Sequence, residues 1–295
     1  MGIDVNAARF LMSAYEDGVC FDRTITLGRL NLYVDEQNCQ TLQRQLNRVA
    51  PNRPAPLTPK GFVEPLFHAL GATQLDSMDR SDFEGATVLH DLNFAIASDL
   101  HQKFDVVYDG GTLEHIFNFP TAIQNAMEMV KVGGHLLIQT PTNNWSGHGF
   151  YQFSPELYYR VLSEENGFRI KRMVVFEWGV NRWYEVADPA KVRSRVYVVN
   201  GCRTSLMILA ERLEVVPINQ SIPQQSDYAL IKWKAENAEA DRPEAAIPRA
   251  IPLTQRFKGV VRHFIYQVKR WQRSAASKKL DYFTQNQQFF TPVDR

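Results

Sequence analysis

Short apolar runs alternate with helical patterns along most of this chain. Residues 23–28 (RTITLG) form a β-branched run that ends in glycine, which predicts a strand followed by a turn. Residues 35–49 have helical spacing, and a second helical pattern begins at 61–71. Residues 50–60 contain four prolines, so this stretch is predicted to be a loop between the two helices.

The middle of the chain repeats the order of strand, helix and strand. Apolar runs of strand length occupy residues 73–79, 86–92, 104–110 and 133–141, and a helical pattern at about 120–131 separates the last two. Strands that alternate with helices indicate βαβ crossovers and a mainly parallel sheet. The ligand crevice of such a sheet lies at the carboxyl ends of its strands.

Three further elements follow. Residues 154–168 predict a helix, with Ser154 as its N-cap and Gly167 just past its end. Residues 169–179 and 203–216 are apolar runs that predict two more strands. The regular alternation therefore continues to about residue 216.

The composition changes after residue 216. Five prolines are spread among Gln, Ala and Glu in residues 217–254, where large apolar residues are few. This composition is typical of a linker. We therefore divide the chain into a domain at 1–216, a Pro-rich linker at 217–254 and a C-terminal tail at 255–295.

The tail contains a basic amphipathic pattern at residues 255–279. Its apolar positions recur at spacings of three and four and are Phe257, Val260, Val261, Phe264, Ile265, Val268 and Trp271. Eight Lys and Arg residues surround this stripe, and the segment has no acidic residue. Such a helix suits an anionic membrane surface, a groove on a protein partner, or docking on its own domain.

Composition and charge exclude several classes of protein. The hydrophobic content of 44% is that of a globular chain, and the net charge of +1 gives no global field that would attract nucleic acid. The three cysteines do not cluster, which argues against a disulfide framework and a structural zinc site. No signal peptide or membrane span is visible. We expect a cytoplasmic protein, with peripheral membrane association through 255–279 as an alternative.

Residues 104–141 (FDVVYDGGTLEHIFNFPTAIQNAMEMVKVGGHLLIQTP) carry the most specific pattern in the chain. Phe-Asp opens a buried strand, Glu-His begins the crossover, and Lys-x-Gly-Gly leads into an apolar strand. This order is similar to the fourth strand, helix and fifth strand of class I S-adenosylmethionine-dependent methyltransferases. The similarity continues through residues 148–168 (HGFYQFSPELYYRVLSEENGF). It implies an α/β, Rossmann-like, mainly parallel seven-stranded sheet with helices on both faces, to which the C-terminal helical tail is added.

The resemblance also implies that the cofactor is S-adenosylmethionine, and it indicates which residues would bind it. Asp79 is expected to accept from the ribose diol, with Asp76 as the runner-up. Asp91 is expected at the adenine amino group, with Asn93 close by. The other residues implied at the cofactor are Asp109, Gly110, Gly111 and Glu114.

The region after the first strand departs from the family pattern. The family has an acid followed by Gly-x-Gly-x-Gly, whereas this chain has only Thr26-Leu27-Gly28-Arg29-Leu30-Asn31. Gly28 is the one glycine that remains of the cofactor loop. The degenerate loop keeps a second interpretation open, in which the domain is a catalytically inactive binding or assembly module.

Methyl transfer needs alignment of donor and acceptor and, for a hydroxyl or acid acceptor, removal of a proton. His148 lies between two glycines in the loop after the fifth strand and is the candidate base. Tyr151 and Trp145 are candidates for the acceptor pocket, while His115 is expected to be structural. We expect no metal site and a small-molecule or glycan-type acceptor.

Overall fold

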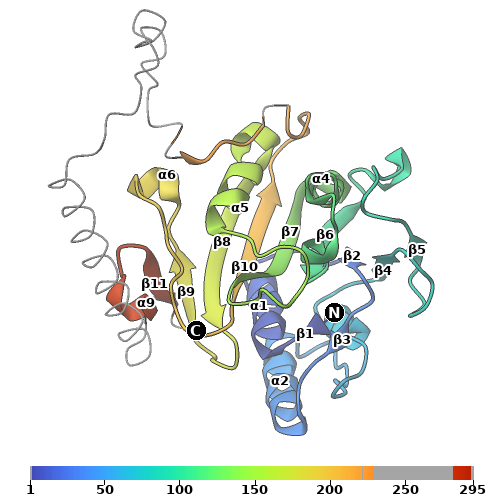
Figure 1. Ribbon diagram of the computed structural model, residues 1–295. Helices are drawn as coiled ribbons and strands as arrows, with labels where there is room; N and C mark the ends of the chain where they lie inside the picture. The colour runs from blue at the N-terminus through green and yellow to red at the C-terminus, as the bar shows by residue number, and fades with distance from the viewer. Residues whose placement is uncertain (1, 221, 227, 229–281, 294–295) are drawn as a thin grey trace, which may run out of the picture.

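The computed structural model describes residues 2–220, 222–226, 228 and 282–293, and its centre is a twisted sheet between helices (Figure 1). The α-helices are α1 (Val5–Glu16), α2 (Glu36–Val49), α3 (Glu64–Ala69), α4 (Phe119–Met129), α5 (Pro155–Val161), α6 (Pro189–Val192) and α9 (Tyr282–Gln285). Three 3-10 turns are η1 (Ser98–Leu100), η2 (Leu113–His115) and η3 (Glu164–Asn166). The strands are β1 (Gly2–Ile3), β2 (Arg23–Leu27), β3 (Asn31–Leu32), β4 (Gln74–Asp79), β5 (Val88–Leu89), β6 (Phe104–Gly110), β7 (Val130–Asn143), β8 (Phe168–Glu177), β9 (Trp183–Val186), β10 (Thr204–Arg212) and β11 (Phe290–Val293).

The main sheet has the strand order β11-β9-β8-β10-β7-β6-β2-β4-β5. The pairs from β7 to β5 are all parallel, and chain order reverses at β2, which has β4 on one side and β6 on the other. This reversal is the topological switch point at which doubly wound sheets bind ligands. The α/β, Rossmann-like architecture expected from the sequence is therefore present.

The prediction of a mainly parallel, seven-stranded sheet is wrong in strand number and in direction. The described part of the sheet has nine strands, and β10 runs antiparallel to both β7 and β8. Beyond β8 the chain turns back through β9 without a crossover helix, so these strands also pair antiparallel. The ninth strand, β11, comes from the C-terminal segment and pairs with β9.

Helices cover both faces of the sheet. On one face, Ile123 of α4 and Tyr158 of α5 belong to one buried cluster with apolar residues of the strands. On the other face, Leu11 of α1, Leu42 of α2 and Phe67 of α3 belong to a second cluster. Side chains that point alternately to the two faces of β6 and β7 contribute to both clusters.

A small second sheet brings the N-terminus to the switch point. Strand β1 pairs parallel with β3, and Tyr33 donates its backbone N–H to the Ile3 carbonyl at 2.8 Å. Asp4 caps the following helix, because its side chain accepts from the Ala7 N–H at 2.8 Å. The residues that precede α1 are thereby fixed close to the end of β2.

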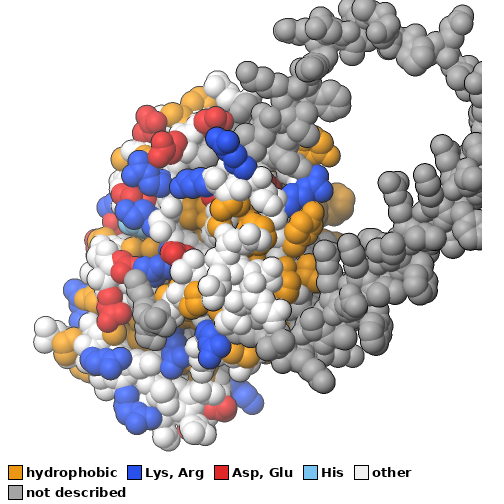
Figure 2. All heavy atoms as spheres, turned by 90° about the vertical axis from the view of Figure 1, so that its left-hand side faces the viewer, with side chains coloured by type: hydrophobic (Ala, Val, Ile, Leu, Met, Phe, Trp, Pro, Cys, Tyr) orange, Lys and Arg blue, Asp and Glu red, His pale blue; other side chains and the backbone are white. Residues whose placement is uncertain are grey.

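The predicted tail is described only in part. The helix expected at 255–279 and most of the expected linker lie outside the described residues. Residues 282–293 form α9 and β11 at the sheet edge, where Phe283 and Phe290 are fully buried. Figure 2 views the molecule from this side, and on the part shown in colour the acidic and basic side chains are interspersed. No helix in the described ranges is both long and apolar enough to cross a bilayer.

Candidate functional site

A cavity of about 860 Å³ opens at the carboxyl ends of β4, β6 and β7. The strand register aligns these ends along one edge of the sheet. Leu27 of β2 pairs with Met78 and with Asp109, and Gly110 pairs with Gln139. The volume lies within the range of small-molecule and cofactor sites. Most of the residues proposed from the sequence line it, namely Asp79, Asp91, Asn93, Gly110, Gly111, Glu114, Trp145 and His148.

Two carboxylates lie at one end of the cavity. Asp79 is the last residue of β4, and its Oδ1 accepts only from the Ser81 N–H at 3.3 Å among the bonds of the described residues. Asp91 follows β5, and its Oδ1 accepts from the Asn93 backbone at 3.0 Å and from the Asn93 amide at 2.8 Å. These bonds hold the pKa of Asp91 below its ordinary value, the backbone bond contributing most. Asp91 Oδ2 also lies 3.5 Å from Nε of the exposed Arg80. Each carboxylate has lone pairs that can accept from hydroxyl or amino donors of a ligand.

Asp76, the runner-up, faces elsewhere. Its carboxylate accepts from Gln74 Nε2 at 2.8 Å and from Thr87 Oγ1 at 2.9 Å, outside the cavity. Asp76 and Asp79 are three residues apart on β4 and so point to opposite faces of the strand.

Two glycines bring the backbone of β6 close to the cavity. A Cβ atom on Gly110 would lie 2.8 Å from Leu30 Cδ1, so a larger residue would displace that side chain. Gly111 has a φ of +93°, a conformation that residues with a Cβ rarely adopt. Glycine is thus favoured at Gly111 by its backbone conformation and at Gly110 by the close Leu30 side chain, and both positions line the cavity.

Gly28 and Asp109 do not line the cavity. Gly28 has a φ of +79° and makes the turn after β2, where its N–H donates to the Met78 carbonyl at 2.7 Å. Asp109 is buried beneath the cavity, and its Oδ1 accepts from the backbone N–H groups of Thr112 at 2.8 Å and Leu113 at 3.3 Å. Burial raises the pKa of Asp109 to about 7. Both residues shape the loops that carry the cavity lining.

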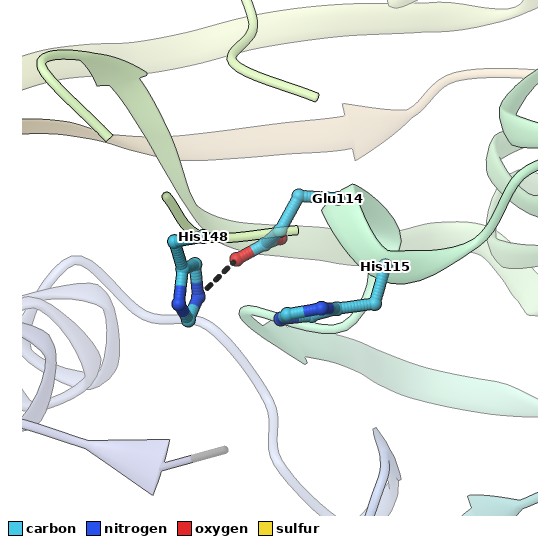
Figure 3. A group of neighbouring side chains, drawn as sticks. All are labelled: Glu114, His115 and His148. Carbon is cyan, nitrogen blue, oxygen red and sulfur yellow. Dashed lines mark ion pairs between the residues drawn. The ribbon is translucent and has the colours of Figure 1, made fainter. Parts of the chain in front are cut away.

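Glu114, His115 and His148 converge at the other end of the cavity (Figure 3). Glu114 Oε1 lies 3.7 Å from His148 Nε2, and Glu114 Oε2 accepts from Thr140 Oγ1 at 3.4 Å. The two imidazole rings meet edge to face with centroids 4.7 Å apart. Burial, followed by the charge of Asp109, raises the pKa of Glu114 to about 8. Burial and His148 lower the pKa of His115.

Aromatic side chains surround this end of the cavity. The Trp145 ring lies 5.3 Å from the His148 ring and 5.2 Å from the Trp178 ring, and both tryptophans line the cavity. Tyr151 does not line it, because its hydroxyl donates to the Phe117 carbonyl at 2.7 Å and its ring stacks on Phe153. Tyr151 thus holds the loop in place.

Residues of the N-terminal segment and of β7 also line the cavity, although no sequence pattern predicted this. Gly2, Asp4 and Tyr33 line the cavity next to the turn where the family's glycine loop would lie. Burial raises the pKa of Asp4. The signal for Asp4 was an acid immediately before an apolar helical pattern. Gln139 also lines the cavity, and its Oε1 is buried without a hydrogen-bond partner among the described residues.

No family model and no curated protein matches this chain. Similar solved structures include 1,6-didemethyltoxoflavin-N1-methyltransferase from Burkholderia thailandensis, solved with 1,6-didemethyltoxoflavin and S-adenosylhomocysteine. It has 11% identity over 71% of this chain and 80% of its own, with a TM-score of 0.37. The branched-chain polyamine synthase of Thermus thermophilus, solved with N4-aminopropylspermidine and 5'-methylthioadenosine, has 12% identity over 76% and 60%, with a TM-score of 0.37.

The YcgJ protein of Bacillus subtilis is also similar, with 8% identity over 70% of this chain and 100% of its own and a TM-score of 0.39. Likeness at this level concerns the chain fold alone. What this chain binds has to be argued from its own cavity.

Proposed function

We propose that this chain is an S-adenosylmethionine-dependent methyltransferase that acts on a small-molecule or glycan-type acceptor. The observation that carries the proposal is a single cavity with two acceptor carboxylates, Asp79 and Asp91, at the ends of neighbouring strands. The same cavity has a two-glycine backbone edge beside the switch point and titratable groups at its far end.

The carboxylate end matches the nucleoside part of the cofactor. Asp79 accepts from the ribose diol, and Asp91 accepts from the adenine amino group, since both need a hydrogen-bond acceptor. The Gly110–Gly111 edge lets the ligand approach the backbone. Asp4 replaces the acid that is missing after β2 and faces the amino group of the methionine part. The N-terminal segment thereby substitutes for the degenerate loop at Gly28.

The opposite end receives the acceptor. Adenosylmethionine supplies an activated methyl group; the acceptor atom forms a bond to its carbon, the carbon–sulfur bond breaks, and the sulfur keeps that electron pair. A hydroxyl acceptor must also lose a proton, which His148 can receive. Trp145 and Trp178 offer flat apolar faces on which an aromatic or sugar ring can pack.

Binding of S-adenosylhomocysteine tests the proposal directly. Ligand at about 100 times its dissociation constant should stabilise the fold by about 2.7 kcal/mol, measured as a thermal shift. Asp79→Asn should weaken binding about 10- to 100-fold in calorimetry, because a charged acceptor is lost from the diol. Asp76→Asn is the matched control and should bind as the wild type does. No thermal shift with adenosylmethionine or adenosylhomocysteine would favour the inactive binding module instead.

A further inference from the structure

Three potential metal ligands converge on one point of the cavity. They are a carboxylate oxygen of Glu114 and one ring nitrogen each of His115 and His148, and these atoms all lie within 4.8 Å of one another (Figure 3). Three atoms bound to one zinc ion at about 2.0–2.2 Å would be about 3.4 Å apart. A small rotation of the two imidazoles would bring the three ligand atoms to this separation. Both histidines are exposed and have room to rotate, whereas Glu114 is buried.

The surroundings hold the ligands in place. The loop that carries His148 is bound to the backbone of Glu114, since Phe150 N–H donates to the Glu114 carbonyl at 2.8 Å. Gly149 permits this approach: it has a φ of +67°, and an added Cβ would lie 2.8 Å from the same carbonyl. Thr140 supports the second oxygen of Glu114 at 3.4 Å. Supporting bonds of this kind orient the ligands of metal sites in proteins.

Among the described residues, the ion-pair partner of the Glu114 carboxylate is His148. The Glu114 side chain is 2% exposed, and its ion pair with the 46% exposed His148 spans 3.7 Å, which is longer than a direct hydrogen bond. A buried carboxylate is stable in its ionised form when it is paired or coordinates a metal. A divalent cation between the Glu114 carboxylate and the two imidazole rings would place a positive charge in direct contact with that carboxylate.

We propose that Glu114, His115 and His148 bind one divalent transition metal ion at the acceptor end of the cavity. The expectation of no metal site was based on spacing along the sequence, which cannot reveal ligands 33 residues apart. Two imidazoles and one carboxylate suit zinc, iron or cobalt, whereas magnesium and calcium prefer oxygen ligands. Three protein ligands leave a coordination position open, and all three residues line the cavity, so an acceptor hydroxyl could occupy it.

Metal binding can be tested on the full chain without adenosylmethionine, so this proposal and the proposed function can fail separately. The protein is stripped with a chelator and titrated with zinc against a chromophoric indicator, and with cobalt followed by its visible absorption. One equivalent of each metal should bind per chain. His115→Ala and His148→Ala should each weaken zinc binding at least about 10- to 100-fold, since even supporting residues contribute that much. Both side chains are exposed, so the fold should tolerate the changes.

His101→Ala is the matched control, because His101 lies 3.4 Å from Glu128 in a histidine–glutamate pair outside the cavity. It should leave zinc affinity unchanged. The double variant His115→Ala/His148→Ala should lose the stoichiometric site and the cobalt spectrum. The proposal is overturned if the wild type binds no stoichiometric zinc, if the double variant retains it, or if equimolar magnesium displaces it.

Discussion

Asp109 shows how a single buried acid organises the edge of the cavity. Its Oδ1 accepts from two backbone N–H groups of the η2 turn, while its Oδ2 has no hydrogen-bond partner among the described residues. Its pKa is raised to about 7 and that of nearby Glu114 to about 8, because both are buried. Protonation of this pair is therefore coupled to the stability of the fold.

Asp109→Asn should change how stability depends on pH. The folded-state pKa of about 7 lies above the ordinary value near 3.9, so the folded wild type binds more protons than the unfolded chain between these values. Its stability consequently falls as pH rises through this window. Asparagine keeps the Oδ1 acceptor and cannot ionise. Relative to the wild type, the variant should gain roughly 2 to 3 kcal/mol between pH 5 and pH 7 in urea unfolding.

The control for this measurement is Asp99→Asn, because Asp99 is exposed in η1. It should follow the pH profile of the wild type. Parallel profiles for Asp109→Asn and the wild type would show that Asp109 does not titrate with a raised pKa.

At the scale of elements, the sequence predicted the strands that are marked by a local run of apolar residues. The strands expected at 23–28, 73–79 and 104–110 are β2, β4 and β6 to within a residue at each end, because each is a dense apolar run between turn residues. The edge strand β11 and its neighbour β9 were missed, since four-residue strands that pair across about 100 residues leave no local period. Cavity-lining positions that follow strand ends, such as Asp79 and Gly110, were predicted, whereas Asp4 and Tyr33 were not, because they reach the cavity through the pairing of β1 with β3.

Helix α4 depends on such a long-range contact at its C-terminus. Arg212, at the end of β10, is buried, and its Nη1 donates to the carbonyls of Met127 at 3.1 Å, Glu128 at 3.1 Å and Val130 at 2.7 Å. The last carbonyls of a helix have no partner within the helix. Arg212 of the antiparallel strand β10 thus also caps α4, the helix that connects the parallel strands β6 and β7.

Arg212→Met should destabilise the protein by roughly 2 to 4 kcal/mol in urea unfolding. Methionine fills the space of the side chain but leaves three carbonyls without their charged donor. Arg169→Met is the comparison, because the Arg169 side chain is 54% exposed in its pair with Glu164. Exposed pairs contribute at most about 1 kcal/mol. A similarly small loss for Arg212→Met would mean that α4 does not need this cap.

At the scale of the whole molecule, residues before and after the stretch 229–281, which lies outside the described residues, contact the core. Ser226 donates its N–H to Glu156 of α5 at 2.8 Å, and residues 282–293 join the far edge of the sheet through β11. The segment expected to form a helix at 255–279 lies within this stretch. Its three proposed roles remain predictions from the sequence: binding to an anionic membrane surface, binding to a protein partner, and docking on its own domain.

The C-terminal attachment can be tested through Phe290. Its ring is fully buried, 5.0 Å from the ring of Phe283, which in turn lies 4.9 Å from Tyr184 of β9. Phe290→Ala would leave a cavity in this cluster and should lower the free energy of unfolding by about 3 to 5 kcal/mol. Phe83→Ala, at a position that is 90% exposed, should change it by less than about 0.5 kcal/mol. Chemical denaturation of the full chain compares the two. Equal, small losses would mean that β11 does not contribute to the cooperative fold, and the domain would then end with β10 rather than with the C-terminal strand.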